Sequence, residues 1–227
     1  MTSNIAGTRS KPKLATTDKG LLAMMMEDFG PRVLSVWKDL RSTTRNLMQR
    51  AWQSPASVAS MQSSRSGPYD PHSDSELSRL LAALDERASE TGQSKDDEPA
   101  GRARRLADAC ASVLTQQTQS AEVFARLIQR AHTRKDYARI DEMADIMAKR
   151  LAPSEVCEMA RSNNAVVQAL AQEALTQMPA PLLMALLCDP VDAAVARVAL
   201  QRQATEYASE EAQRALREFE EFRLEDF

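Results

Sequence analysis

Residues 152–171 read APSEVCEMARSNNAVVQALA, and 28 positions further along the chain residues 180–199 read APLLMALLCDPVDAAVARVA. The two stretches share one layout: an Ala-Pro start, a short apolar run, a turn with Asn or Asp, and a second run rich in Ala and Val. Proline is favoured in the first turn of a helix, and Asn and Asp favour helix starts. The layout therefore predicts helical hairpins that repeat along the chain.

The repeat extends beyond these two stretches. A shift of 28 residues places Val167 on Val195 and Leu170 on Val198, and a shift of 27 places Val167 on Ile140. Stacked hairpins of this kind bury their apolar faces against one another and end in a capping helix. The expected bounds are residues 120–149, 150–177 and 178–205 for three hairpins, with a closing helix from Ser209.

Two segments carry a family resemblance. Residues 162–175 read SNNAVVQALAQEAL, and residues 189–200 read DPVDAAVARVAL. An Asp-Pro turn followed by a second helix patterned with Ala, Val and Leu resembles the HEAT-like α-helical repeats, over about residues 120–205. The resemblance implies an α-solenoid with a scaffold or adaptor role.

Composition favours the same fold class. Aromatic residues make up 4% of the chain, while Ala, Leu, Met, Gln, Glu and Arg dominate, and these residues favour helices over sheets. We expect an all-α protein: a short right-handed stack of antiparallel helical hairpins, with a detached N-terminal amphipathic helix and flexible linkers. The expected divisions are a disordered tail at 1–17, a helical region at 18–52, a Ser/Pro-rich linker at 53–74, a helix and polar break at 75–101, and the repeat domain with its capping helix at 102–227.

Charge and cysteine usage constrain the location and the partners. The net charge of −3 divides at Tyr69 into a positive first part and a more strongly negative remainder. Because phosphate neutralisation needs Lys and Arg on one face, an acidic repeat domain argues against nucleic acid as a partner. Cys110, Cys157 and Cys188 lie among apolar residues at wide spacing, so we expect buried free thiols and a cytoplasmic location, with a peripheral position at a membrane as the alternative.

The segment from Pro31 to Trp52 is the strongest candidate for a contact site. On a helix its apolar residues fall within an arc of about 120° and its basic residues lie outside that arc. Such a helix lies on an anionic membrane, fits a partner's groove, or packs on the protein's own body. The candidate partner- or membrane-binding residues are Val33, Val36, Trp37, Leu40, Leu47, Met48, Arg41 and Arg45.

The residues needed for catalysis do not converge in the sequence. The chain has two histidines, His72 in the expected linker and His132 at an expected helix end, and neither pairs with a Cys-x-x-Cys spacing. The carboxylates Asp136, Asp141, Glu142 and Asp145 have basic neighbours and are typical of a solvated helix face. We expect no catalytic residue, no cofactor and no metal.

The sequence therefore predicts a non-catalytic protein–protein interaction module, a scaffold or adaptor, in which the basic amphipathic helix is a second contact element. A membrane-surface regulator that uses this helix to bind anionic lipid is the alternative. A HEAT-like enzyme acting on nucleic acid is the third and least favoured hypothesis, because the two tryptophans lie outside the repeats.

Overall fold

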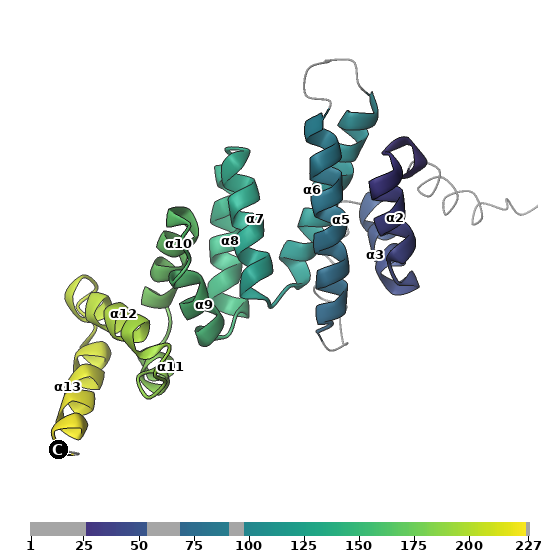
Figure 1. Cartoon of the computed structure of the whole chain (residues 1–227). Coiled ribbons are helices and arrows are strands. Elements are labelled where there is room, and N and C mark those ends of the chain that lie inside the picture. The colour runs from purple at the N-terminus through teal and green to yellow at the C-terminus, as the bar shows by residue number, and fades with distance from the viewer. Residues whose placement is uncertain (1–25, 54–68, 91–97, 226–227) are drawn as a thin grey trace, which may run out of the picture. The chain divides into compact units, whose positions relative to one another are not determined.

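The computed structural model describes residues 26–53, 69–90 and 98–225, and the regular structure in these ranges is entirely α-helical (Figure 1). The expectation of an all-α chain built from packed helical hairpins is confirmed for this part of the protein. The expected tail at 1–17 and most of the expected linker at 53–74 lie outside the described residues.

The described residues form two compact units. Unit 1 holds residues 26–53, 79–90 and 98–110, and unit 2 holds residues 69–78 and 111–225. Two long helices, α5 (Pro71–Glu90) and α6 (Glu98–Gln117), contribute residues to both units.

The segment from Pro31 to Trp52 forms two helices in unit 1, so the expectation of one continuous helix is wrong. Helix α2 (Pro31–Asp39) ends before Leu40, whose backbone is extended, and α3 (Ser42–Gln53) then begins. The sequence Ser42-Thr-Thr explains the restart, because hydroxyl side chains compete with helical hydrogen bonds in a helix interior and favour helix starts. Leu40, at the break, is buried.

Ion pairs and a side-chain hydrogen bond connect the segments of unit 1. They join α2 to α5, a residue shortly before α2 to α6, and α6 to α5. The ion pairs are Arg32 with Glu86, Arg79 with Asp39 (3.6 Å) and Arg102 with Asp28 (3.2 Å). The Arg104 Nη2 donates a hydrogen bond to the Ala88 carbonyl (3.2 Å).

Unit 2 is a stack of helical hairpins. Each hairpin packs on the next, and α13 packs on the last one (Figure 1). The helices are α7 (Ala121–Thr133), α8 (Tyr137–Arg150), α9 (Pro153–Ala160), α10 (Ala165–Thr176), α11 (Ala180–Leu186), α12 (Ala193–Thr205) and α13 (Glu210–Glu225). The expected three hairpins and the start of the closing helix are confirmed to within three residues at every expected boundary.

The second helices of the three hairpins start at a constant interval. Their N-cap residues are Asp136, Asn164 and Asp192, which are 28 residues apart. The Asp136 and Asn164 side chains accept hydrogen bonds from backbone N–H groups of the first helical turn. Asp192 has no such bond and instead pairs with Arg161. The 28-residue repeat of the sequence therefore corresponds to a structural repeat.

The closing helix is held at its start and along one side. Ser209 Oγ accepts a hydrogen bond from the Ala212 N–H (3.2 Å), as expected for an N-cap. Ala212 and Ala215 are buried, and the Arg197 guanidinium of α12 lies over the Phe219 ring at 5.4 Å. A guanidinium over an aromatic face is a stabilising contact. Helix α13 thus covers one side of the last hairpin, as expected.

The region before α7 differs from expectation in its boundaries. Helix α5 starts at Pro71, before the expected start at residue 75, and α6 starts at Glu98, inside the range expected to hold a helix and a polar break. Asp70 Oδ1 accepts from the His72 N–H (3.0 Å), which places the cap earlier. Among the described helices, none is long and apolar enough to cross a bilayer.

Candidate functional site

The structure brings the predicted contact residues of the N-terminal region together, but mostly inside unit 1. Val33, Trp37, Leu40 and Met48 are buried. Val36, Leu47 and Arg45 are partly covered, and Arg41 is exposed. The Arg45 Nε is itself buried, with no hydrogen-bond partner among the described residues. Of the three sequence-based alternatives, the described structure therefore has this apolar stripe packed on the chain's own helices.

The basic side of the same segment is the part that solvent reaches. Lys38, Arg41 and Arg50 are exposed on α2 and α3. An exposed basic side without its apolar stripe attracts anionic surfaces only through charge, and that attraction weakens with salt. The use of this segment as a partner or membrane contact stays a prediction.

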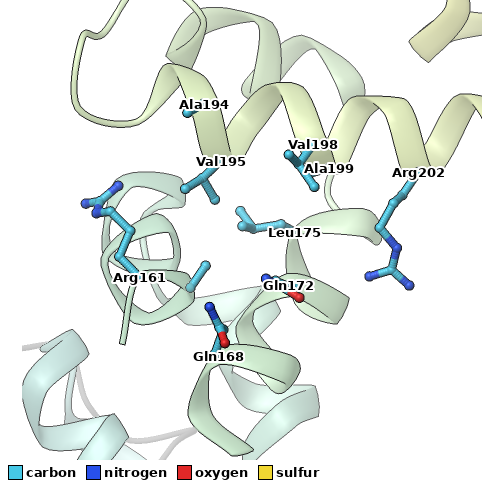
Figure 2. A pocket seen from close by; sticks show the side chains of 10 residues that line it. Arg161, Gln168, Gln172, Leu175, Ala194, Val195, Val198, Ala199 and Arg202 are labelled. Atoms are coloured by element: carbon cyan, nitrogen blue, oxygen red, sulfur yellow. The ribbon is translucent and has the colours of Figure 1, made fainter. Parts of the chain in front are cut away.

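A hollow in unit 2 lies in the hairpin stack, between the end of α9, helix α10 and helix α12 (Figure 2). Its volume is about 370 Å³. Leu175 of α10 and Val195 and Val198 of α12 give it an apolar interior, as Figure 2 shows. A hollow of this size falls within the usual range of ligand-binding pockets. We refer to it as the α10–α12 groove.

Helical spacing brings the groove residues to one face of each helix. Val195, Val198, Ala199 and Arg202 are three, four and seven residues apart on α12, which places them along one stripe. On α10, Gln168, Gln172 and Leu175 follow the same spacing, and these three side chains face α12.

Val198 is the most unusual of the apolar groove residues. Its side chain is 50% exposed although aliphatic residues surround it. Leu170, which occupies the corresponding position in the preceding repeat, is less exposed than Val198. Val195 lines the groove, whereas its counterpart in the preceding repeat, Val167, is fully buried. The same sequence pattern thus makes core in one hairpin and an accessible apolar surface in the next.

Two arginines stand at opposite ends of the groove (Figure 2). Arg161 Nη1 donates to the Asp192 carboxylate (2.6 Å) and to the Val191 carbonyl (3.2 Å). Arg202 pairs with Glu206 one turn further along α12 (3.1 Å) and with Glu173 of α10 (3.6 Å). The Asp192 carboxylate is only 6% exposed, whereas Glu206 is 53% exposed. The Arg161–Asp192 pair is therefore a fixed part of the structure, whereas the carboxylates that pair with Arg202 are accessible to solvent.

Two glutamines form one side of the groove. Gln168 and Gln172 lie one helical turn apart on α10. No hydrogen bond within the described residues holds either carboxamide. A carboxamide offers both donors and acceptors. The groove therefore combines an apolar interior with hydrogen-bonding groups along one side and, at each end, an arginine that pairs with carboxylates of the chain.

The cysteines divide into buried and exposed thiols. Cys110 and Cys157 are buried as expected, but Cys188 is exposed. The expectation failed for Cys188 because α11 ends at Leu186, so that Cys188 lies in the turn before Asp189-Pro190. Burial raises the pKa of the Cys157 thiol to about 11, and the nearby Asp192 carboxylate adds to the shift.

The remaining polar candidates lie on the surface. The side chains of Asp136, Asp141, Glu142 and Asp145 are exposed, and Glu142 pairs with Arg139 at 3.7 Å. His132 lies in the last turn of α7. Within the ranges that the structure describes, no three His, Cys, Asp or Glu side chains are grouped in a way that could hold a metal ion.

The sequence did not single out the groove, although it contained a signal. The repeat aligned Val195 and Val198 with apolar residues of the preceding hairpin, and this alignment suggested core for both. The signal was the pair Gln168 and Gln172 on the facing helix, polar residues opposite an apolar stripe. Polar and apolar faces meet in this way at the rim of a binding site more often than in a core.

Comparison with known proteins gave no match to a protein-family model, to a characterised protein or to a solved structure. The residues of the groove therefore carry the functional inference.

Proposed function

We propose that this protein is a non-catalytic protein–protein interaction module, a scaffold or adaptor of the HEAT-like α-solenoid type, and that the α10–α12 groove is its binding site. The single observation that supports this proposal is the groove itself, in which a half-exposed valine lies among aliphatic side chains between two helices.

The chemistry of the lining supports binding rather than catalysis. The lining side chains are aliphatic groups, carboxamides and guanidinium groups. Aliphatic groups favour contact with another apolar surface, and carboxamides and guanidinium groups form hydrogen bonds that orient it. Guanidinium groups remain protonated across the physiological pH range and carboxamides do not titrate there, so none of these polar groups serves as a general base.

The hairpin repeat supports the choice of partner class. Stacked hairpins present extended surfaces formed by successive helices, and such surfaces suit another polypeptide. Helices α10 and α12 are the second helices of neighbouring hairpins, so the groove lies on such a surface. The basic side of α2 and α3 is, in this proposal, a second and weaker contact element.

The experiment uses a random heptapeptide library displayed on phage, selected against the immobilised full-length chain. We expect enriched peptides that bind the wild-type chain and lose at least tenfold in affinity for Val198→Glu, because a buried charge in the groove is costly. Leu182→Glu is the matched control, since Leu182 is a similarly exposed aliphatic residue (48%) that does not line the groove.

Circular dichroism and thermal unfolding of both variants verify that each one is folded. Selection without enrichment, or enriched peptides that bind the wild-type chain and Val198→Glu equally well, would contradict the proposal.

A further inference from the structure

We infer that the α10–α12 groove takes an extended, uncharged peptide segment with aliphatic side chains, and that Gln168 and Gln172 bind its main chain. This inference rests on the proposed function and names the chemistry of the partner.

The two glutamines occupy positions that are apolar in the preceding hairpin. The N-caps of α8 and α10 are 28 residues apart, and this shift places Gln168 on Ile140 and Gln172 on Ala144. Ile140 is buried, whereas Gln168 is only partly covered and Gln172 is exposed. Helix α10 packs on α8 and on α12. The apolar pattern of the repeat is therefore interrupted by carboxamides on the helix that lines the hollow.

These carboxamides lie beside apolar surface without a partner of their own. Both side chains face α12 across the hollow (Figure 2), and no hydrogen bond within the described residues holds either of them. A carboxamide carries donors and an acceptor, and a peptide group offers the matching acceptor and donor. The main chain of a bound peptide can therefore satisfy both glutamines.

The spacing of the two glutamines suits an extended main chain. Residues four apart on a helix are separated by about 6 Å along its axis. In an extended peptide the groups that point to one side recur every two residues, which is about 6.6 Å. Gln168 and Gln172 can therefore hydrogen-bond to main-chain groups two residues apart. A helical ligand is less suitable, because its main-chain groups are already bonded internally.

The charges of the groove are compensated within the chain. Arg161 pairs at 2.6 Å with Asp192, whose carboxylate is 6% exposed. Arg202 pairs with Glu206 (3.1 Å) and with Glu173 (3.6 Å). The other side chains that line the hollow are aliphatic groups and carboxamides. A charged ligand residue would lose water here without gaining an unpaired opposite charge, which is costly. In charge, the groove is complementary to an uncharged segment.

The apolar interior provides for aliphatic side chains. Val195, Val198 and Leu175 come from two helices and face the same hollow, and Val198 is half-exposed. Covering Val198 removes apolar surface from water, which favours binding. Because successive side chains of an extended peptide point to opposite sides, every second one lies toward this surface. We expect Val, Ile or Leu at alternate positions of the ligand.

The first test analyses the heptapeptides obtained by selection against the full-length chain. We expect the Val198-dependent peptides to carry aliphatic residues at alternate positions and to be depleted in Asp, Glu, Lys and Arg relative to the unselected library. Their affinity, measured by fluorescence polarisation, should change less than about twofold when the ionic strength is raised about tenfold, because salt screens charge–charge attraction only.

The second test restores the apolar pattern of the repeat. The double variant Gln168→Ile/Gln172→Ala installs the residues of the corresponding positions in α8. We expect it to remain folded in thermal unfolding and to bind the selected peptides about tenfold more weakly, because two hydrogen bonds are lost. Gln129→Ala is the matched control, since Gln129 is an exposed glutamine of α7, and its affinity for the peptides should be unchanged.

The third test uses the wild-type chain and a selected peptide whose main-chain N–H groups are methylated one at a time. An N-methyl group removes a hydrogen-bond donor from the main chain. We expect affinity to fall at least about fivefold at alternate positions and to change little at the positions between them, as in an extended ligand held on one side.

The outcomes separate the two proposals. Val198-dependent peptides that are rich in charged residues, that bind the double glutamine variant as well as wild type, or that tolerate N-methylation at every position overturn this inference and leave the proposed function standing. A full-length chain that dimerises in analytical ultracentrifugation and becomes monomeric on Val198→Glu would assign the groove to a second copy and overturn it as well. Peptides that bind independently of Val198 overturn both proposals.

Discussion

At the scale of single residues, the two arginines of the groove have different roles. Arg161 connects the end of α9 to the loop before α12 through Asp192, whose carboxylate is almost fully buried. Removal of one partner from such a pair leaves an uncompensated charge. Arg202 pairs only with exposed carboxylates.

This difference predicts unequal costs of substitution. Because Arg161 is itself 36% exposed, we expect Arg161→Ala to lower the free energy of unfolding by about 2 kcal/mol, less than the loss of a fully buried pair. Arg202→Ala should lower it by clearly less, because its partners are exposed carboxylates. Urea denaturation followed by circular dichroism measures both. Equal losses for the two variants would mean that the Asp192 pair is not the stronger one.

The cysteines differ in accessibility in the same region. Cys157 is buried and its pKa is raised to about 11, whereas Cys188 is exposed in a turn. A thiol reacts as its thiolate, so a raised pKa and burial both slow its reaction. Because burial raises the folded-state pKa of Cys157 to about 11, above that of an exposed thiol, Cys157 favours the folded state at neutral pH, and this contribution is lost as pH rises toward 11.

Thiol titration at pH 8 tests this description. We expect one thiol per chain to react with Ellman's reagent in the folded protein and three after denaturation. Cys188→Ser should abolish the fast reaction, and Cys157→Ser should leave it unchanged. Rapid reaction of the Cys188→Ser variant while it is still folded would show that Cys157 or Cys110 is accessible.

At the scale of helices, packing decides what the amphipathic pattern of residues 31–52 does. The hydrophobic arc was correctly identified, and Val33, Trp37 and Met48 are indeed on the buried side. Amphipathicity alone does not reveal what covers an apolar stripe. The ion pairs of Arg32 and Asp39 with α5 involve residues about 40 to 54 positions away, and sequence periodicity carries no information on such pairings.

The buried stripe predicts weak interaction with membranes. In a Trp52→Phe variant, which leaves Trp37 as the single tryptophan, we expect no shift in emission when vesicles of equal parts phosphatidylcholine and phosphatidylglycerol are added. A free peptide of residues 31–52 is the control, since its stripe is uncovered and should respond. A blue shift with the full-length variant would show that unit 1 opens on anionic lipid.

Helix starts were predictable where side chains cap them, and helix contacts were not. Asp136, Asn164 and Ser209 all cap helices that the sequence predicted, because capping depends on neighbours in the chain. Gln203 was not anticipated. It is buried on α12 and donates to the Thr176 and Met178 carbonyls after α10, at 2.9 and 2.7 Å. Its partners lie 25 to 27 residues away and depend on the stacking of the hairpins.

At the scale of the whole molecule, the 28-residue repeat allowed the hairpin stack of unit 2 to be predicted from sequence, because repetition specifies both the helices and their neighbours. The groove could not be predicted in the same way. It arises where the repeat is imperfect, so that Val195 and Val198 occupy positions whose counterparts are covered more fully. A small difference in packing changes a core position into an accessible one.

The central claim is that a partner binds in the α10–α12 groove. Methyl-detected NMR of the full-length chain, labelled at Val and Leu and titrated with a peptide selected from the heptapeptide library, tests that claim directly. We predict that the methyl signals of Val195, Val198 and Leu175 shift first and saturate together, while those of Val33 and Leu77 do not move. Shifts confined to other residues, with the three groove signals unchanged at saturation, would contradict the account.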